Sequence, residues 1–453
     1  MPTQRISGSL VFGTSAGRQL VGAFDGGAIS SNGGVLLLGA ADRAIKLTER
    51  VARCFRDLRS PEWIVHPLEN LIRQRVYGLA LAYEDLVDHD QLRFDPALTA
   101  ALRPAERALA GKSTLNRLEH AAKVGAERNH KIDHDAQAFE RLFVDLFLDA
   151  HRQPRSRMVI DLDATDDPLY GNQEGRHFHG YYDGYCYLPL YIFCDRHLLA
   201  AKLRSASVDA ATGSVEEVAR IVAQVRERWP DVRIVIRADS GFCRDDLMAW
   251  CEENGVDYVL GLAGNARLLA RIAPELRLAR RRAKRTGRAA RVFKDFRFRT
   301  LDSWSAERRV IGKAEWTQGE ANPRFIVTNI HAAKGGAAFL YEHLYCQRGE
   351  MENRLKECQT DLFADRTPTP TMQANQLRLW LSSLAYVLLC AVRRIGLAGT
   401  KLQNATCGTI RLQLLKIGAL VTVSVRRVKV AFTSSCPSAD SFARAARRLC
   451  AGA

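Results

Sequence analysis

The apolar residues in the first third of the chain recur at helical spacing. Between Asn32 and His151 they follow an i, i+3, i+4 pattern, which is typical of helices with one buried face. Ser31 or Asn32 is suited to cap the first of these helices, Ser113 and Asp135 are suited to cap later ones, and Pro67 is suited to the first turn of another. We therefore predict a mainly helical N-terminal domain over residues 1–155.

The pattern changes at Arg157, where short apolar runs replace the helical spacing. Strands and helices are then predicted in the order three strands, helix, strand, helix, strand. They lie at residues 158–163, 185–193, 197–203, 215–229, 232–238, 245–253 and 258–262. This order predicts an α/β fold with a mixed sheet whose later strands are parallel and joined by crossover helices. It resembles the layout of an RNase H-like core flanked by helices.

Further strands are predicted after this core, at residues 293–300, 308–316 and 324–330. We interpret them as an inserted β-rich subdomain, after which helical spacing returns and completes the core. The predicted domains are a first core part at 156–270, the insertion at 271–335, a second core part at 336–400 and a C-terminal region at 401–453. The last region has a β-like stretch and is expected to contact DNA or a second copy of the chain.

The composition favours a polyanionic partner. The 453 residues include 66 lysines and arginines against 50 acidic residues, so the formal charge is +16. Such an excess attracts nucleic acid through the release of counterions. The eleven cysteines include no C-x-x-C pair, which argues against a zinc ribbon and against the disulfide framework of a small secreted protein.

No segment is predicted to enter a membrane or to direct export. Residues 1–13 lack the basic and apolar regions of a signal peptide. Residues 377–392 are apolar, but polar residues interrupt them and they are fewer than the roughly 20 that a membrane span requires. We therefore expect a buried helix there, no membrane contact and a cytoplasmic protein.

Acidic residues on the predicted strands are the first candidates for chemistry. Asp161 and Asp163 are two positions apart, so both side chains lie on one face of their strand. Asp239 directly follows the buried strand 232–238, and ligand sites collect at strand ends in open sheets. Carboxylates on adjacent strands supply the oxygen ligands that a hard divalent cation requires.

A predicted helix near residue 350 brings further polar groups. At about 100° per residue, one stripe of this helix contains Tyr345, Arg348, Glu352, Lys356 and Gln359. An adjoining stripe is apolar and contains Leu344, Met351, Leu355 and Cys358. The helix can therefore pack on the sheet and present polar groups at once. Gly349 costs the helix about 1 kcal/mol relative to alanine, which a close approach of DNA or of the sheet would explain.

Asp163, Asp239 and Glu352 form a set suited to phosphodiester cleavage by two metal ions. In that mechanism the metals lie roughly 3.5–4 Å apart; one lowers the pKa of the attacking hydroxyl and the other stabilises the leaving oxygen. The alternative is that each carboxylate is a surface or capping residue, and the residue pattern alone leaves it open.

The chain resembles the DDE transposases of bacterial insertion sequences, of the type whose last motif reads Tyr-x2-Arg-x3-Glu-x6-Lys. Tyr345, Arg348 and Glu352 match the spacing of that motif. The Asp-x-Thr motif of the family is similar to residues 163–165, and its Asp-x-Gly-Phe motif is similar to residues 239–242.

This resemblance covers about residues 157–394 and implies both a function and its ligands. It implies a transposase that binds the terminal inverted repeats of its element as a homodimer or larger assembly, with the N-terminal helices taking part in recognition. Strand cleavage and strand transfer would use Asp163, Asp239 and Glu352 as the catalytic and metal-binding residues. Two Mg²⁺ ions are implied per site, with Mn²⁺ as a substitute, and Asp161 would be an auxiliary carboxylate.

The same resemblance implies contacts with DNA phosphates. In the family, the tyrosine, arginine and lysine of the last motif hold phosphates near the metals, which assigns Tyr345 and Arg348 to this role. The final lysine is Gln359 in this chain, and glutamine cannot neutralise a phosphate. We expect the role to pass to Lys356, one turn earlier on the same face, while Gln359 keeps a hydrogen-bonding contact.

Two features of the predicted insertion are also candidates for DNA contact. Related enzymes stack an insertion tryptophan on a flipped base, and Trp316 and Trp304 are the candidates here, with core packing as the alternative. A basic run is expected to follow the DNA backbone, the alternative being a solvated helix face. The run comprises Arg277, Arg280, Arg281, Arg282, Lys284, Arg285, Arg288 and Arg291.

Two other functions compete with this interpretation. Residues 159–165 match the Asp-x-Asp-x-Thr signature of haloacid-dehalogenase-like phosphatases, in which Asp161 would be the nucleophile and Asp163 the acid/base. The glycine- and tyrosine-rich stretch that follows argues against this fold, which should continue into a crossover helix. The other competitor is a DNA-binding protein with a decayed catalytic core. His177 and His179 lack nearby cysteines and are better explained as structural residues than as a zinc site.

Overall fold

The computed structural model describes residues 8–102, 108–120, 131–317 and 319–451. The chain divides into two compact units, and the second contains the predicted core. The first comprises Met1–Ala52, Arg59–Leu118 and Ala391–Ala453, and the second comprises Arg53–Leu58 and Glu119–Cys390.

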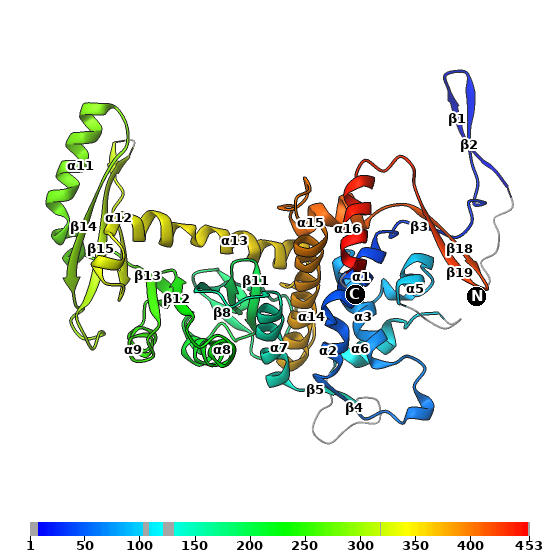
Figure 1. The fold of residues 1–453 in the computed structure, drawn as a ribbon, viewed down its shortest axis with the longest axis horizontal. Coiled ribbons are helices and arrows are strands. Elements are labelled where there is room, and N and C mark those ends of the chain that lie inside the picture. Colours follow the sequence, from blue (N-terminus) through cyan, green and yellow to red (C-terminus); the bar gives the residue numbers. More distant parts are fainter. Residues whose placement is uncertain (1–7, 103–107, 121–130, 318, 452–453) are drawn as a thin grey trace. The chain divides into compact units, whose positions relative to one another are not determined.

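A large mixed sheet forms the centre of the second unit (Figure 1). Its first strands in the chain are β6 (Arg157–Ala164), β10 (Leu190–Cys194), β11 (His197–Lys202), β12 (Arg233–Ala238) and β13 (Asp257–Leu262). They lie in the order β11-β10-β6-β12-β13. β6, β12 and β13 are parallel, whereas β10 is antiparallel to β6 and β11. This is the RNase H-like arrangement that the sequence predicts, so the fold class is confirmed.

Both faces of this sheet are covered, which explains why its strands are almost continuously apolar. On one face, Ile234 and Ile236 of β12 pack in a core with the crossover helices α8 (Ser214–Arg228) and α9 (Asp245–Glu253). On the other face, Val235 packs with Leu340 and Leu344. These two leucines belong to a helical stretch over Ala337–Asp361, made of α12 (Ala337–Phe339), the π-helical turn η4 (Leu340–Tyr345), η5 (Cys346–Arg348), α13 (Gly349–Lys356) and the π-helical turn η6 (Glu357–Asp361).

The strands predicted as a separate insertion continue the same sheet instead. They are β14 (Ala290–Phe298), β15 (Arg308–Thr317), the short β16 (Glu320–Ala321) and β17 (Arg324–Thr328). β17 pairs with β13, β15 with β17, and β14 with β15, all antiparallel. The pairing satisfies the backbone groups that β13 would otherwise leave at an open edge. Two helices precede these strands, α10 (Ala266–Arg271) and α11 (Ala273–Thr286).

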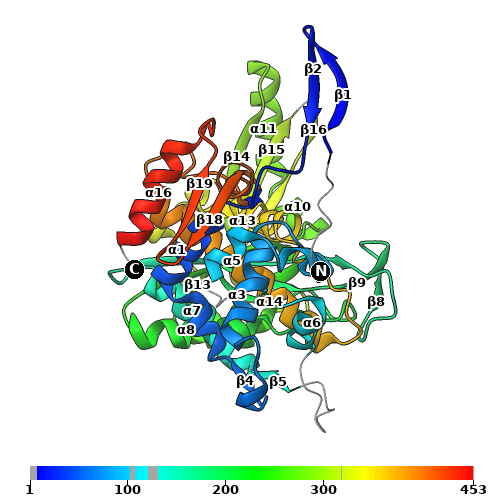
Figure 2. The ribbon, with the colours of Figure 1, turned by 90° about the vertical axis from the view of Figure 1, so that its right-hand side faces the viewer.

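The strand predicted over residues 185–193 is in fact two strands in two sheets. Gly184–Tyr187 forms β9, and β10 begins only at Leu190. Pro189, which has no backbone N–H to donate, lies between them. β9 pairs with β7 (Asp167–Pro168) and β8 (His177–His179) in a small antiparallel sheet, which Figure 2 shows at its right-hand edge.

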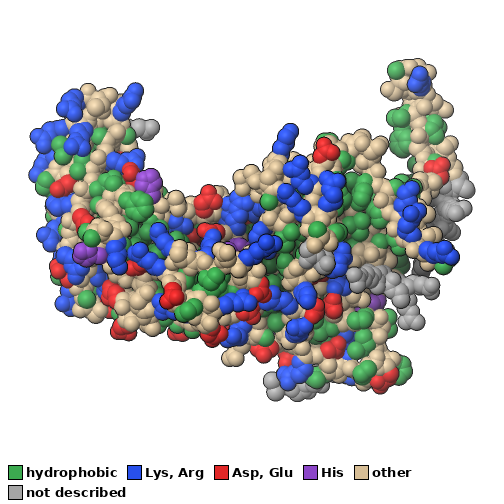
Figure 3. All heavy atoms as spheres, in the orientation of Figure 1, with side chains coloured by type: hydrophobic (Ala, Val, Ile, Leu, Met, Phe, Trp, Pro, Cys, Tyr) green, Lys and Arg blue, Asp and Glu red, His purple; other side chains and the backbone are tan. Residues whose placement is uncertain are grey.

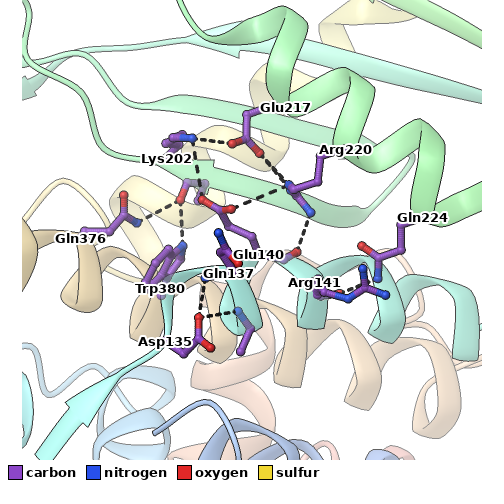
Figure 4. A network of polar contacts seen from close by, with 12 residues as sticks. Asp135, Gln137, Glu140, Arg141, Lys202, Glu217, Arg220, Gln224, Gln376 and Trp380 are labelled. Carbon is purple, nitrogen blue, oxygen red and sulfur yellow. Dashed lines mark hydrogen bonds and ion pairs between the residues drawn. The ribbon is translucent and has the colours of Figure 1, made fainter.

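A polar network fixes two helices to the edge strand β11 (Figure 4). The helices are α7 (Ala136–Asp149), which Asp135 caps as predicted, and α14 (Met372–Ala391). Trp380 of α14 donates its indole N–H to the carbonyl of Ala201 at 3.0 Å. Lys202 of β11 lies 3.8 Å from Glu140 of α7, and it also donates at 2.6 Å to Glu217 of α8, which accepts from Arg220 at 2.9 Å. Two short strands of the unit, β4 (Phe55–Asp57) and β5 (Ile132–His134), pair beside α7.

One helix of the described residues, Met372–Gly396, is long and apolar enough to cross a membrane. Its most apolar window is 78% buried within the chain, which is typical of a core helix. Length and composition alone are therefore weak grounds for a membrane span.

The first unit joins the two ends of the chain. β3 (Ile29–Ser30) pairs with β18 (Ala419–Ser424), which forms a hairpin with β19 (Arg427–Phe432). Residues 1–52 and 59–118 of the predicted N-terminal domain thus share one unit with the predicted C-terminal region, because strands nearly 400 residues apart pair in it, whereas residues 53–58 and 119–155 belong to the second unit. Its helices are α1 (Val35–Ile45), α2 (Leu47–Ala52), α3 (Leu68–Ala80), α4 (His89–Leu92), α5 (Pro96–Leu102), α6 (Lys112–Glu119), α15 (Cys407–Ile410) and α16 (Ala439–Ala451).

The start of this unit differs from the mainly helical prediction. β1 (Leu10–Ser15) and β2 (Arg18–Gly22) form an exposed hairpin. Asn32 does not cap α1; it bonds to Asp95 and Tyr83 through its side chain. Residues 1–7, part of the segment expected not to direct export, lie outside the described residues.

Candidate active site

Two of the three predicted carboxylates meet at one edge of the sheet. Asp163 lies near the end of β6, and Asp239 directly follows β12. Because β6 and β12 are parallel neighbours, their carboxyl ends lie side by side. The backbone N–H of Ala164 donates to Asp163 Oδ1 at 3.0 Å, and that of Gly241 donates to Asp239 Oδ1 at 2.8 Å. These bonds orient both carboxylates at the end of the sheet.

Arg348 connects the third carboxylate to the first. Glu352 lies on the exposed side of α13, while Met351 and Leu355 on the same helix are buried. Arg348 Nη2 donates to Glu352 Oε1 at 2.9 Å, and its Nη1 lies 3.4 Å from Asp163 Oδ2. The predicted polar and apolar faces are therefore confirmed, and the helical stretch brings Glu352 and Arg348 to the edge that carries Asp163.

The electrostatics of this edge favour an added cation. The pKa of Asp163 is raised to about 6, chiefly by burial and with smaller contributions from the nearby Asp239 and Glu352, against the opposing effects of Arg348 and the Ala164 N–H. One guanidinium thus does not compensate the local negative charge. Asp163 and Asp239 together form a crowded, partly desolvated carboxylate pair.

Tyr345 reaches the same edge because a glycine leaves room for it. A Cβ atom built on Gly261 of β13 would lie 2.6 Å from the Tyr345 hydroxyl and 3.1 Å from the backbone of Asp239. Any larger residue at position 261 would displace the tyrosine. In contrast, a Cβ atom on Gly349 would meet nothing within 4 Å, so the sheet does not require that glycine.

Arg237 is a residue of this region that the sequence interpretation missed. It lies on β12 opposite Asp161 and binds it with two bonds, Nε to Oδ1 at 2.5 Å and Nη2 to Oδ2 at 2.7 Å. Its Nη1 donates to the carbonyl of Leu344 at 2.6 Å. Both side chains of the ion pair are more than 90% buried. Arg237 therefore ties the two central strands to the helical stretch that carries Glu352.

Gln359 and Lys356 have different surroundings. Gln359 turns toward the loop after β6, where its side-chain amide donates to the carbonyl of Asp166 at 3.1 Å and lies 3.4 Å from Asp167 Oδ1. Lys356 is exposed, and no ion pair joins it to another residue in the described part of the chain. Of the two, only Lys356 presents a free cation to solvent.

Comparison with known protein families decides between the interpretations of this site. The sequence profile described as transposase DDE domain group 1 matches residues 12–451, nearly the whole chain. The chain belongs to this DDE transposase family. No curated protein matches it. Family membership implies a nuclease or transposase that acts on DNA.

DDE transposases generally use divalent metal ions, and the residues of this member fit such an ion in kind. Asp163, Asp239 and Glu352 offer only oxygen donors, as Mg²⁺ prefers. In the described ranges, however, no three His, Cys, Asp or Glu side chains lie close enough together to hold a metal, and the Arg348 guanidinium bonds to both Asp163 and Glu352. Burial, with the nearby Asp239 and Glu352, raises the pKa of Asp163, and a divalent ion would favour its charged form.

The basic run of this DDE transposase family member lies on α11 and just after it. Ala279 and Ala283 face β14 and β15, while the cationic side chains point to solvent, and Figure 3 shows Lys and Arg gathered over this helix. The exposed cations with no ion pair to another described residue are Arg277, Arg280, Arg281, Arg282, Lys284, Arg285 and Arg288. Arg291 differs, since it pairs with Glu342 and Glu315.

The two candidate tryptophans differ in burial. Trp304 is buried, in edge-on contact with Phe298, so it packs in the core. Trp316 at the end of β15 is half-buried, and the Arg280 guanidinium lies 5.0 Å from its ring centre. Stacking by Trp316 on a base stays a prediction.

Proposed function

We propose that the chain is a DNA transposase that binds the terminal inverted repeats of its own insertion sequence and catalyses strand cleavage and strand transfer. The observation that carries the proposal is the meeting of Asp163, Asp239 and the Arg348-linked Glu352 at one edge of an RNase H-like sheet. The proposed site of action is the bacterial cytoplasm. A homodimer or larger assembly would hold the two ends together.

Each polar residue at this edge has a proposed role. Asp163, Asp239 and Glu352 would hold two Mg²⁺ ions, for which Mn²⁺ can substitute. When bound, the ions supply an activated hydroxyl nucleophile and stabilise the leaving oxygen. Tyr345 and Arg348 bind the phosphate beside the scissile bond, Arg348 by its planar donor fork. Lys356 neutralises a neighbouring phosphate.

The phosphatase alternative is disfavoured by the contacts of Asp161. An aspartate nucleophile must offer a carboxylate oxygen to phosphorus. Both oxygens of Asp161 accept hydrogen bonds from Arg237, and the side chain is buried. Attack would require this ion pair to break first.

The decisive experiment is a cleavage assay on labelled DNA that carries the ends of the element, resolved on a denaturing gel. Wild-type protein should nick the element boundary in Mg²⁺ and not in Ca²⁺. Asp239→Asn should still bind the DNA and lose nicking by about a thousandfold or more. The matched control is Asp231→Asn, at an exposed turn residue just before β12, which should nick like the wild type. Binding without nicking by the wild-type protein would instead support the decayed-core alternative.

A salt titration tests the proposed role of α11. Replacement of Arg281, Arg282, Lys284 and Arg285 by glutamine should reduce the slope of log affinity against log salt by roughly 0.9 for each lost phosphate contact. The control is Arg228→Gln on α8, which breaks an ion pair with Asp149 and should leave the slope unchanged. An unchanged slope in the fourfold variant would make α11 a solvated face.

A further inference from the structure

The small sheet β7-β9-β8 and its connecting residues, 167–187, expose an unusual number of aromatic side chains. We call it the aromatic sheet. Tyr170 is 91% exposed and Tyr181 is 85% exposed, and Phe178 and Tyr185 are each 47% exposed. A patch of exposed aromatic side chains usually marks a binding surface, because exposure of apolar rings to water is unfavourable unless a ligand covers them.

The base of the aromatic sheet is fixed to the rest of the second unit. The Tyr187 hydroxyl donates to the carbonyl of Glu174 at 2.5 Å. The backbone N–H of Glu174 donates to Pro370 at 2.8 Å, and its carboxylate accepts from the N–H of Met372 at 3.0 Å. Leu169 is tied to Tyr185 by a backbone bond of 2.8 Å. The exposed rings therefore stand on an ordered platform, which lowers the entropy cost of binding.

Three of the four exposed rings lie in two groups of contacting aromatic side chains. Phe178 and Tyr185 are opposite each other on β8 and β9, with ring centres 5.6 Å apart, and the Arg176 guanidinium lies 4.5 Å from the Tyr185 ring centre. Tyr181 and Tyr182 form the second group, with ring centres 5.0 Å apart. Each group thus combines a π-face with hydroxyl groups or a cation.

The second group is continuous with the candidate active site. Tyr182 packs against the same small core as Ala164, the neighbour of Asp163. Burial, with smaller effects of Asp166 and Asp163, raises the pKa of Tyr182 to about 12, which places its hydroxyl within electrostatic reach of both carboxylates. Tyr181 extends from this point into solvent.

We propose that the aromatic sheet binds unpaired nucleotides of the DNA strand that reaches the carboxylate edge. Tyrosine rings stack on any base, whereas the faces of bases in a duplex are already covered by their neighbours. The cation Arg176 can pair with the backbone of the same strand. The proposal relies on the proposed function for DNA as the ligand and adds that part of this DNA is single-stranded at the site.

The test measures binding without metal, so that it does not depend on cleavage. Fluorescence anisotropy compares a labelled oligothymidylate of about 20 nucleotides with a duplex of equal length in EDTA. The double variant Tyr170→Ala/Tyr181→Ala should bind the single strand about tenfold more weakly and the duplex within about twofold of wild type. Tyr170→Phe/Tyr181→Phe keeps both rings and should retain single-strand binding.

The matched control is Leu301→Ala, at an apolar residue of the second unit that is 75% exposed, and it should leave both affinities unchanged. Unchanged single-strand binding by the double alanine variant would overturn the proposal, as would an equal loss on the duplex. Sedimentation of the same variants tests whether a second copy of the chain covers this surface instead. Loss of a dimer in the double alanine variant would make the surface a contact between copies and would also overturn the proposal. If single-strand binding falls as expected while the wild-type protein never nicks DNA, this proposal stands and the transposase function fails.

Discussion

Asp161 and Asp163 extend from the same face of β6, two residues apart, yet their surroundings are opposite. Asp161 is buried and both its oxygens are bonded by Arg237. Asp163 receives one backbone bond and a guanidinium 3.4 Å away, and it faces two other carboxylates. Burial raises the pKa of both aspartates, but only Asp161 has a matched cation bonded to both of its oxygens.

This difference separates a structural from a chemical role more sharply than residue type does. A compensated carboxylate fixes geometry and its charge is already neutralised, whereas an undercompensated one attracts a cation from solution. Arg237 serves the first role toward the helical stretch, through its bond to Leu344. Variants that change the charge around each aspartate therefore test this contrast.

The largest effect is expected where the compensated pair is broken. Arg237→Met leaves Asp161 buried without its cation and should lower the free energy of unfolding by about 3–5 kcal/mol. The double variant Asp161→Leu/Arg237→Met removes both charges and should recover most of that loss. Urea unfolding of the wild-type protein and the two variants measures both changes.

The double variant also tests the positioning role of Arg237. It should still cleave DNA poorly while binding it normally, because the carbonyl of Leu344 has lost its donor. Full cleavage by the refolded double variant would show that the tie to the helical stretch is dispensable.

At Asp163, in contrast, a substitution is expected to raise the free energy of unfolding. Its pKa is raised to about 6 in the folded protein, so its contribution to stability is present at low pH and is lost as the pH rises from about 4 to about 6. Asp163→Asn removes this penalty and, without divalent metal, should raise the free energy of unfolding at neutral pH by about 1–3 kcal/mol. Cleavage should be lost.

Unfolding curves in EDTA between about pH 4 and about pH 8 measure the effect, because this range extends from near the ordinary pKa of Asp163 to above its raised pKa. The wild-type protein should lose stability relative to Asp163→Asn across this range, and excess Mg²⁺ should restore it to the wild type only. Parallel pH profiles would show that Asp163 carries no excess charge.

A substitution of Arg348 should have a smaller effect, because this residue offsets only part of the negative charge and lies at an edge open to solvent. Arg348→Gln removes a cation that competes with metal for Asp163 and Glu352, so Mn²⁺ should bind the DNA-free protein roughly two- to fivefold more tightly. Calorimetric titration measures the affinity, with Arg228→Gln on α8 as a control for loss of a distant charge. Weaker Mn²⁺ binding by Arg348→Gln would mean that Arg348 organises the carboxylates instead of competing for them.

The elements that the sequence predicts well are those defined by local periodicity. The strands and crossover helices of the sheet, and the two faces of α13, follow from apolar spacing alone. Asp163 and Asp239 could be placed because parallel neighbouring strands bring their ends together. The meeting of Asp163 and Asp239 at one edge of the sheet could therefore be predicted from the sequence.

The remaining features depend on contacts between distant residues. The pairing of Ile29–Ser30 with Ala419–Leu420 has no local signal, and neither does the junction of β17 with β13. Arg237 had one weak signal, a lone arginine within an apolar strand beside a strand that carries Asp161. Its three hydrogen bonds become visible only when both strands and the helical stretch are in place.

The smallest effect is expected at Gln359, where the resembling motif has lysine. Its neighbour Asp167 is fully buried, one of its oxygens lacks a hydrogen-bond partner among the described residues, and burial raises its pKa. Gln359→Lys would place an ammonium group near Asp167 Oδ1 and turn this uncompensated carboxylate into a pair like Asp161 and Arg237. Because desolvation offsets most of the attraction, the free energy of unfolding should change by only about 1 kcal/mol or less.

The diagnostic sign of this change lies in its dependence on pH. Because the pKa of Asp167 is raised, the free energy of unfolding of the wild-type protein falls as the pH rises. A nearby lysine opposes this fall by favouring the charged carboxylate. The stability of Gln359→Lys relative to wild type should therefore grow from acidic to neutral pH. Gln347→Lys, at an exposed position of the same helical stretch, adds an equal charge away from Asp167 and should show no such growth. Equal profiles for the two lysine variants would place Asp167 among the compensated carboxylates and weaken the contrast on which these predictions rest.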